Sequence, residues 1–376
     1  MRAKLKQLLE HLDATLDYDR QERIEDLFRR TLQWEPVERL PLALSYPLPD
    51  DAPFQPFPHR EVFDDPEKML YNELVLAFET SIAWHEQIGD DLPYAIRTNF
   101  GCVLIASLFG ARVEQVEDNP PWVRHFETLE DFERVLDRDP CDLSQGWCPR
   151  VIEWMEFYRS VLDGYPTLQR CIRVVLPDLQ GPIDTAELLR GSELYLDFYD
   201  RPDTVQRVLA AAATAQVHLA RRLSRLTTDG PEGFCHQHAK MLAGHILVRD
   251  DSSIMISANM YREHIAPHDE FVLREMGGGG VHSCGNMNHL IDEMLSLPSI
   301  RSLDFGQSEM NDIDAIYAKA EDRKIALIRV MVPEEQLTTG RVLERFGTGV
   351  VLHHQADSAQ DAARIVKAYM QHSRDP

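Results

Sequence analysis

The second half of the chain alternates short apolar runs with amphipathic segments, and this alternation constrains the fold more than any other feature. The apolar runs have the length of buried strands, and the amphipathic segments repeat apolar residues at helical spacing. Such alternation predicts parallel strands joined by crossover helices. The expected strands are 171–176, 233–238 or 244–250, 279–284, 301–305, 325–330 and 349–354. The expected helices are 151–163, 184–190, 203–226, 259–276, 286–297, 312–319 and 340–346.

The first half shows a different pattern. Apolar residues at helical spacing predict helices within 1–34, and a series of prolines then leaves 42–46 as one short strand. Further along, we expect a helix at 66–88, β structure at 94–106 and a short helix at 128–137.

The complete set of elements favours one barrel over several domains. We expect an α/β fold, a (β/α)8 TIM barrel over residues 36–376, preceded by an N-terminal helical extension over 1–35. Chains of this length routinely form a single barrel of this kind.

Composition excludes some classes of partner. The 62 acidic side chains against 39 Lys and Arg give a net charge of −23. Nucleic acid and anionic membranes are therefore excluded, because both need clustered basic residues. No apolar run is long enough to span a bilayer, and the basic N-terminus lacks the apolar core of a secretory signal. The six scattered cysteines predict reduced thiols in a cytoplasmic protein. The sequence leaves the oligomeric state open.

A glycine-rich stretch, Gly277–Gly280, leads directly into Val281-His282-Ser283-Cys284-Gly285-Asn286. On a strand, His282 and Cys284 point to the same side because side chains alternate between the two faces. Imidazole and thiolate are preferred zinc ligands, so the pair forms half of a metal site. It also lies where a strand is followed by a helix, the end of a parallel strand at which active sites are built.

Other polar residues near strand ends complete the predicted site. His353 and His354 end the last strand, and only one of two adjacent residues points inward. Asp251 follows a β-like run and is expected to orient a histidine or to act in acid–base chemistry, together with His282. The competing interpretation is a turn-capping carboxylate. We assign Asp304 and Glu309 to surface or loop positions. Three residues are expected to bind a small-molecule substrate: His236, His238 and Asn286.

Three passages resemble the uroporphyrinogen decarboxylase superfamily, which includes the corrinoid methyltransferases. Gly279–Gly285 is similar to its HxCG segment. The other two passages are Pro177–Pro182 with Asp184, Gly191 and Asp197–Pro202, and Arg249–Asp251 with Ser257, Tyr261 and Pro267. The resemblance extends from residue 36 to the end of the chain and implies a (β/α)8 barrel.

The methyltransferase branch implies a specific chemistry. Its zinc is held by the His and Cys of the HxC segment and by a cysteine on the final strand; here His282 and Cys284 match the first two, and His353 or His354 stands at the third position. The resemblance implies that Zn²⁺ activates a thiol for methyl transfer, with a corrinoid as methyl carrier and a corrinoid protein as partner.

The decarboxylase branch is matched less well. Its arginine-rich segment near the first strand has no counterpart in 41–49, and Met331-Val332-Pro333 replaces its later G-N-x-D-P motif. Three hypotheses follow: a zinc-dependent methyltransferase, a metal-independent decarboxylase using Asp251 and His282, and a non-catalytic ligand-binding barrel.

Overall fold

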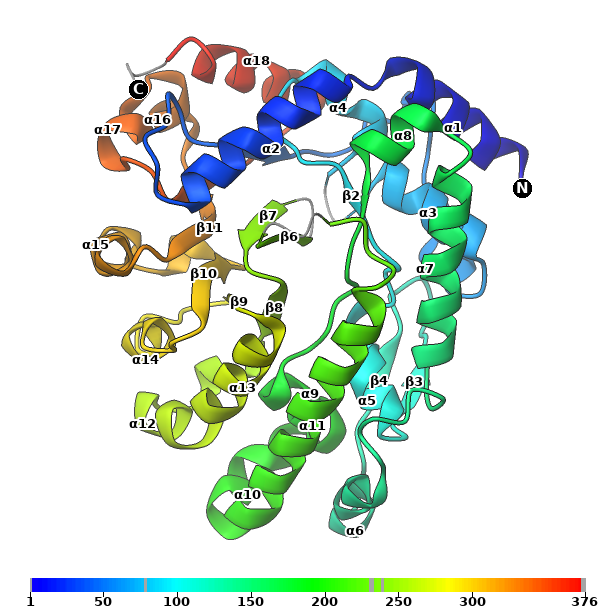
Figure 1. Ribbon diagram of the computed structural model, residues 1–376, viewed down its shortest axis with the longest axis vertical. Coiled ribbons are helices and arrows are strands. Elements are labelled where there is room, and N and C mark those ends of the chain that lie inside the picture. The colour runs from blue at the N-terminus through cyan, green and yellow to red at the C-terminus, as the bar shows by residue number, and fades with distance from the viewer. Residues whose placement is uncertain (1, 78–79, 230–232, 238–239, 373–376) are drawn as a thin grey trace.

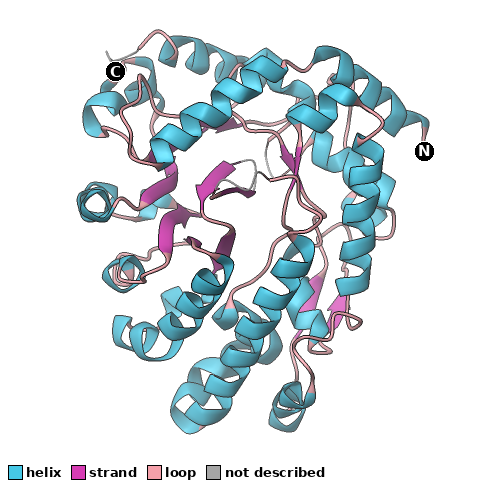
Figure 2. Ribbon diagram, in the orientation of Figure 1, coloured by secondary structure: helices cyan, strands magenta, loops and turns pink. Residues whose placement is uncertain are grey.

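The computed structural model describes residues 2–77, 80–229, 233–237 and 240–372. Strands lie on the inside and helices surround them (Figures 1 and 2). Six parallel strands form one sheet in the order β1-β12-β11-β10-β9-β8. Their bounds are β1 Leu42–Ser45, β8 Ile246–Arg249, β9 Gly279–Ser283, β10 Ile300–Phe305, β11 Ala326–Met331 and β12 Val350–Gln355. The chain is thus an α/β protein with a parallel sheet, as predicted.

Two further parallel strands, β2 Ala95–Ile96 and β5 Arg173–Val174, pair only with each other. Single backbone contacts connect this pair with both edges of the six-stranded sheet. The N–H of Asp91, just before β2, donates to the carbonyl of Leu42 at 2.8 Å. Gln180, beyond β5, forms an isolated parallel bridge to Arg249. Hydrogen bonding among the described strands therefore does not form one continuous closed sheet.

The helices mostly follow the strands in the expected alternation. The helices before β5 are α1 Ala3–Thr15, α2 Tyr18–Leu32, α3 Pro66–Val75, α4 Ile82–Ile88, α5 Leu104–Leu108, α6 Leu129–Glu133, α7 Cys148–Leu162 and α8 Pro166–Cys171. Those after it are α9 Pro182–Arg190, α10 Leu194–Asp200, α11 Pro202–Leu223, α12 Ala258–Met260, α13 Ala266–Met276, α14 Ile291–Leu295, α15 Ile313–Arg323, α16 Glu334–Thr338, α17 Arg341–Arg345 and α18 Ala359–Tyr369. A small antiparallel pair, β3 Arg112–Glu114 and β4 Trp122–Arg124, completes the first half.

Three expected elements differ in the structure. The helix at 66–88 is two helices, α3 and α4, separated by a short bridge between Ala77 and Thr80. Within 94–106 only β2 is a strand, and Leu104 begins α5, whose residues are all buried. A short, wholly apolar run carries no periodicity that separates a buried helix from a buried strand. The helix at 286–297 shortens to α14.

The region 233–250 contains three strands where the sequence predicts one or two. Only β8 joins the six-stranded sheet. The other two, β6 Phe234–Gln237 and β7 Lys240–Ala243, form an antiparallel hairpin. Figure 1 shows this hairpin inside the ring of strands, and β7 packs against β9, β10 and β11.

The hairpin helps to fill the space that the parallel strands surround. Its side chains form a separate apolar cluster with inward-facing residues of β8, β11 and β12 and with α2, which lies next to the hairpin in Figure 1. The cluster consists of Ile24, Phe28, Leu32, Phe234, Cys235, Met241, Leu242, Leu247, Ala326, Ile328 and Val351. The helical extension therefore contributes to the same core as the strands. Its division from the rest at residue 35 stays a prediction.

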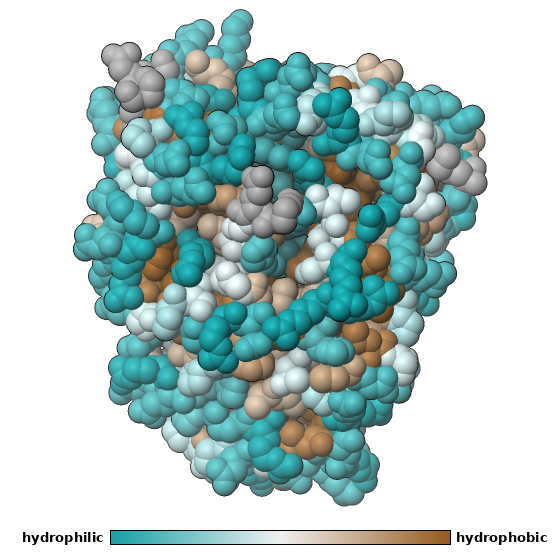
Figure 3. Space-filling model, viewed as in Figure 1, coloured by the Kyte–Doolittle hydropathy of each residue, from teal (hydrophilic) through white to brown (hydrophobic). Residues whose placement is uncertain are grey.

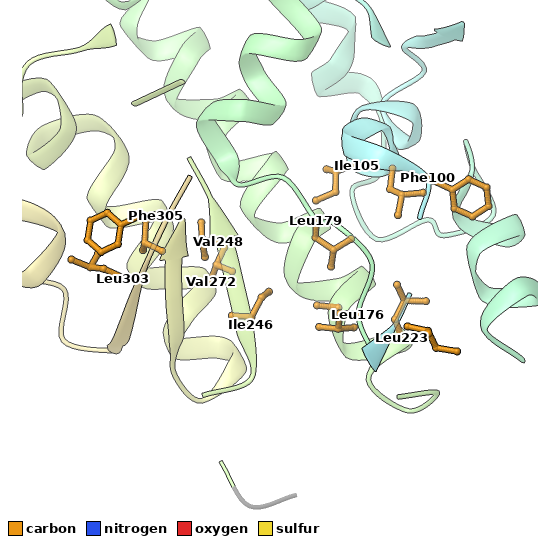
Figure 4. Close-up of a cluster of buried hydrophobic side chains, with 14 of the residues drawn as sticks. Phe100, Ile105, Leu176, Leu179, Leu223, Ile246, Val248, Val272, Leu303 and Phe305 are labelled. Carbon is orange, nitrogen blue, oxygen red and sulfur yellow. The ribbon is translucent and has the colours of Figure 1, made fainter. Parts of the chain in front are cut away.

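The outward-facing side chains of the strands pack against the helices. Figure 4 shows Ile246 and Val248 of β8 close to Val272 of α13, with Leu303 and Phe305 of β10 beside them. All five are fully buried. This core keeps the strand ends, and so the site built on them, in a fixed arrangement.

The molecular surface agrees with the acidic composition. The face seen in Figure 3 is mostly hydrophilic, and apolar side chains appear there in small separate areas. All six cysteines are free thiols. Within the described residues, no helix combines the length and apolar character needed to cross a membrane.

The glycine run has a structural role at both of its ends. Gly277 ends α13 with a φ of 86°, a left-handed conformation that glycine adopts without steric cost. Gly279 lies directly against β8, because a Cβ atom there would stand 2.2 Å from the carbonyl oxygen of Ile246. A Cβ at Gly280 would stand 3.0 Å from Leu247 Cδ1, which faces the interior.

We expect the Gly279→Ala substitution to destabilise the protein by about 1–3 kcal/mol, because the backbone of β8 must move away. Urea unfolding followed by circular dichroism measures this difference. Gly164→Ala is the matched control, since a Cβ at Gly164 meets only the carbonyl of Val161 at 3.4 Å. Equal midpoints for the two variants would contradict close packing at Gly279.

A candidate metal centre at the carboxyl ends of the strands

A cavity of about 400 Å³ opens where the parallel strands end. Its wall includes Arg249, the last residue of β8, together with residues that end or follow β9, β10, β11 and β12. This is the end of a parallel sheet at which α/β enzymes bind their ligands, because the loops that follow the strands converge there.

Three potential metal ligands meet in this cavity: Asp251, His282 and Cys284. His282 Nε2 lies 3.6 Å from Cys284 Sγ and 3.5 Å from Asp251 Oδ1. Zinc–ligand bonds of about 2.0–2.3 Å at a tetrahedral angle separate two ligand atoms by roughly 3.4–3.6 Å. Both of these distances match a tetrahedral zinc site, and the donor atoms of all three residues lie within 4.8 Å of one another. The structure thus brings His282 and Cys284 together.

Asp304 fixes the orientation of the imidazole. Its carboxylate lies 2.6 Å from His282 Nδ1, and both side chains are buried. The two residues are directly paired in the register of β9 and β10. Because the carboxylate accepts the Nδ1 proton, the lone pair of Nε2 faces Cys284 and Asp251, as in carboxylate–histidine–zinc arrangements. Assigning Asp304 to the surface was therefore wrong.

Asp251 is held by the loop that follows β8. Its carboxylate accepts a hydrogen bond from the backbone N–H of Cys284 at 2.7 Å. The buried Asp184 accepts hydrogen bonds from the backbone N–H groups of Asp251 and Ser252, at 3.1 and 2.7 Å. These contacts fix the loop against α9 and β9 and place Asp251 Oδ1 3.5 Å from His282 Nε2. The predicted role of Asp251 in acid–base chemistry stays a prediction.

The charges around Cys284 favour a cation. Burial raises the pKa of the Cys284 thiol to about 12, and the neighbouring Asp251 carboxylate acts in the same direction. A thiol beside carboxylates stays protonated in the absence of a positive charge. A divalent cation among the three donors would reverse this balance, since metal ions deprotonate coordinating thiols.

The two histidines of β12 point in opposite directions. His353 is buried, lines the cavity and lies 3.3 Å from Ser45 Oγ through its Nε2. Burial holds the pKa of His353 well below its usual value, so the ring is neutral and able to act as a ligand. His354 Nδ1 instead lies 2.8 Å from the carbonyl of Val332. Among the described residues, the three whose donor atoms lie close enough to share one metal ion are Asp251, His282 and Cys284. Neither His353 nor His354 belongs to this group.

The two described residues of the expected substrate-binding set, His236 and Asn286, do not line the cavity. His236 lies on the hairpin, where its Nδ1 is 2.6 Å from Asp229, and it does not line the cavity. Asn286 is exposed and accepts a hydrogen bond from the N–H of Asn288. His238 lies outside the described residues. A role of these residues in substrate binding stays a prediction.

Several cavity residues escaped the sequence analysis, among them Asp178, Arg249 and Arg329. Asp178 accepts hydrogen bonds from Arg97 at 2.5 Å and from Arg249 at 2.6 Å. Arg249 is the last residue of a predicted strand, so its position at a strand end could have identified it as a candidate site residue. Asp178 follows a strand as well, whereas Arg329 carries no local signal.

Comparison with known proteins finds a solved structure with the same fold. No protein-family model and no curated protein sequence matches the chain. Among solved structures, a methyltransferase from Methanosarcina mazei superposes with a TM-score of 0.64 at 17% sequence identity. The match covers 93% of this chain and 98% of that one. The two proteins therefore share a fold over nearly their whole lengths.

Asp250, which directly precedes the candidate ligand Asp251, forms a buried pair of carboxyl groups with Asp269. Tyr261 donates a hydrogen bond to Asp269 at 2.7 Å. Burial, followed by the charge of Asp269, raises the pKa of Asp250 well above 3.8, so the folded protein retains a proton there. The unfolded chain releases that proton at lower pH. Stability contributed by this pair is therefore present at acidic pH and is lost as the pH rises towards the pKa of the folded state.

We expect Asp250→Asn to weaken the fall of stability as the pH rises above the ordinary pKa of an aspartate, because asparagine has no proton to lose. Urea unfolding at several pH values gives the slope of the free energy of unfolding against pH. A loss of stability that is the same at every pH does not change this slope. Asp322→Asn, at an exposed helix position, serves as control. Parallel pH profiles for wild type and Asp250→Asn would contradict a protonated Asp250.

Proposed function

We propose that this protein is a zinc-dependent methyltransferase of the uroporphyrinogen decarboxylase superfamily, built on a (β/α)8 barrel of its eight parallel strands. The observation that carries the proposal is the convergence of Asp251, His282 and Cys284, with Asp304 behind the histidine. The shared fold with a methyltransferase supports the same class. The comparisons give no support to the decarboxylase hypothesis.

The residues fit a zinc ion. Asp251, His282 and Cys284 would hold it, and His353 lines the same cavity as a further neutral imidazole. A bound Zn²⁺ supplies a lowered thiol pKa, which makes a thiolate nucleophile available at neutral pH. Three protein ligands leave one position of a tetrahedral site open, as in catalytic zinc centres.

The surrounding residues prepare the chain for this chemistry. Asp304 keeps the proton on Nδ1 of His282, so Nε2 remains an acceptor. Asp184 holds the loop that carries Asp251. The cavity volume of about 400 Å³ is large enough for a small thiol and lies towards the lower end of the range of about 300–1,000 Å³ for ligand pockets.

A corrinoid protein is the proposed methyl donor, and a corrinoid is the proposed methyl carrier. Exposed large apolar side chains lie on segments that follow strand ends: Met255 directly after the Asp251 turn and Met310 after the cavity residue Glu309. Tyr199, also exposed, lies 3.3 Å from Met260 on the segment beyond β8. We propose that these exposed apolar side chains take part in binding the protein partner. We further propose a cytoplasmic location, in keeping with the free thiols.

We expect protein purified without a histidine tag to contain one zinc per chain by elemental analysis. Cys284→Ser should abolish stoichiometric zinc, because it removes a ligand. Asp304→Asn should weaken zinc affinity by about 10–100-fold, since it removes the partner of the ligating histidine. Cys141→Ser, which alters an exposed cysteine that does not line the cavity, should leave the zinc content unchanged. Metal-free wild-type protein with a freely alkylated Cys284 would contradict the proposal.

We expect the zinc-loaded protein to transfer the methyl group of methylcobalamin to a small thiol, and absorbance spectroscopy follows the loss of the methylcorrinoid. Cys284→Ser should lose this activity, and Cys141→Ser should retain it. If zinc binds but no thiol is methylated, and methylcobalamin only raises the melting temperature, the non-catalytic ligand-binding hypothesis replaces this one.

A further inference from the structure

A second cavity lies at the opposite end of the parallel strands from the metal centre. Its volume is about 750 Å³, and its wall is formed mainly by α2, the internal hairpin and the start of β5. Arg173 is the first residue of β5, and Glu38, which also lines this cavity, precedes β1. The cavity, which we call the amino-end cavity, therefore lies where the strands begin. Figure 1 shows α2 next to the hairpin at this place.

One histidine of the hairpin lines the amino-end cavity and has a ring nitrogen without a partner. His236 is only 4% exposed. No group in the described part of the chain forms a hydrogen bond with its Nε2 atom. A buried polar atom without a partner costs free energy. A cation or a hydrogen-bond donor that binds beside Nε2 would recover this free energy.

Asp229 determines which ring nitrogen of His236 carries a proton. Its carboxylate lies 2.6 Å from His236 Nδ1 and also accepts a hydrogen bond from the backbone N–H of His236 at 3.2 Å. Because a carboxylate is an acceptor, Nδ1 is the donor and Nε2 presents its lone pair. Asp304 and His282 form the same carboxylate–histidine arrangement at the metal centre. His236 is therefore oriented in the way that metal-binding histidines are.

A carboxylate stands opposite the lone pair of His236. Glu25 Oε1, on α2, lies 3.9 Å from His236 Nε2. Zinc bonds to nitrogen and oxygen of about 2.0–2.2 Å allow two ligand atoms of one ion to lie up to about 4.2 Å apart. Arg173 holds Glu25 in place, because its Nε and Nη2 donate to the two carboxylate oxygens at 2.9 and 2.8 Å. Each of these oxygens has a second lone pair, which an ion can share.

The charges around His236 favour a cation. Glu25 and Asp229 carry two negative charges and the guanidinium of Arg173 carries one positive charge, so the group has a net charge of −1. The wall of the amino-end cavity as a whole carries five carboxylates and four guanidinium groups. Because the wall is nearly balanced, the placement of the two facing acceptor atoms, and not a general field, selects the ligand.

We propose that the amino-end cavity contains a second metal site, in which His236 Nε2 and Glu25 bind a divalent transition-metal ion such as Zn²⁺. Imidazole and carboxylate suit such ions, and water completes the coordination. With two protein ligands, this site binds the ion less tightly than the metal centre, which offers three. The ion connects α2 with the hairpin and so stabilises the packing of the first helices. This inference is independent of the proposed function.

Titration of metal-free protein with Zn²⁺ at neutral pH, followed by isothermal titration calorimetry, tests the second site. We expect wild type to bind one ion tightly and one more weakly. Cys284→Ser should lose the tight event and retain the weak one, whereas His236→Gln should lose the weak event alone. His218→Gln, which alters an exposed histidine of α11, should retain both events.

Two further variants separate metal binding from a structural effect of His236. Asp229→Asn keeps both ligands but loses the carboxylate that orients the imidazole, so the affinity of the weak event should fall by about 10–100-fold. Glu25→Gln removes the second ligand without altering the hairpin, so it should lose the weak event as well. Zn²⁺ should also raise the melting temperature of Cys284→Ser, but not that of the same protein with Glu25→Gln added.

The results that would overturn the second site differ from those that would overturn the proposed function. Absence of the weak event in wild type would overturn the second site. So would a weak event that is undiminished when His236→Gln is combined with Cys284→Ser. Absence of the tight event in wild type would instead contradict the proposed function, and the weak event would still decide the second site.

Discussion

The hydrogen bond between His282 and Asp304 is the interaction on which the site depends. It joins two neighbouring parallel strands at directly paired positions, so the strand register itself brings the imidazole and the carboxylate together. Fixing the proton on one ring nitrogen makes the other an acceptor aimed at Cys284 and Asp251. Buried carboxylates are costly unless they are paired, and this pairing makes Asp304 tolerable in the interior.

Sequence patterns predicted the local features of this site and missed those that depend on pairing. The HxC spacing identified His282 and Cys284, because two-residue periodicity is a property of one strand. Asp304 was misassigned, since its importance comes from the register between two strands. Arg329 was missed for a related reason: the pairing of β11 with β12 shifts between Leu327 and Val330, and this irregularity breaks the alternation on which a prediction from spacing relies. The same limit applies to the fold, where β8 to β12 were expected but the internal hairpin was not.

Packing explains why the glycines precede the site. Gly279 lets β9 approach β8 closely, and this places His282 beside Arg249 in the strand pairing. Gly280 keeps a side chain out of the interior, where Leu247 and the hairpin already meet. The glycine run and the histidine–cysteine pair therefore depend on each other: the glycines determine how closely β9 lies to β8, and that position places His282 and Cys284 in the cavity.

The internal hairpin gives the chain an unusual dependence between distant segments. Its two strands lie between β5 and β8 in the sequence, yet they pack with α2 near the N-terminus and with β11 and β12 near the C-terminus. The apolar cluster around the hairpin therefore joins segments from both ends of the chain, and contacts of such long sequence separation carry a high entropic cost of loop closure during folding.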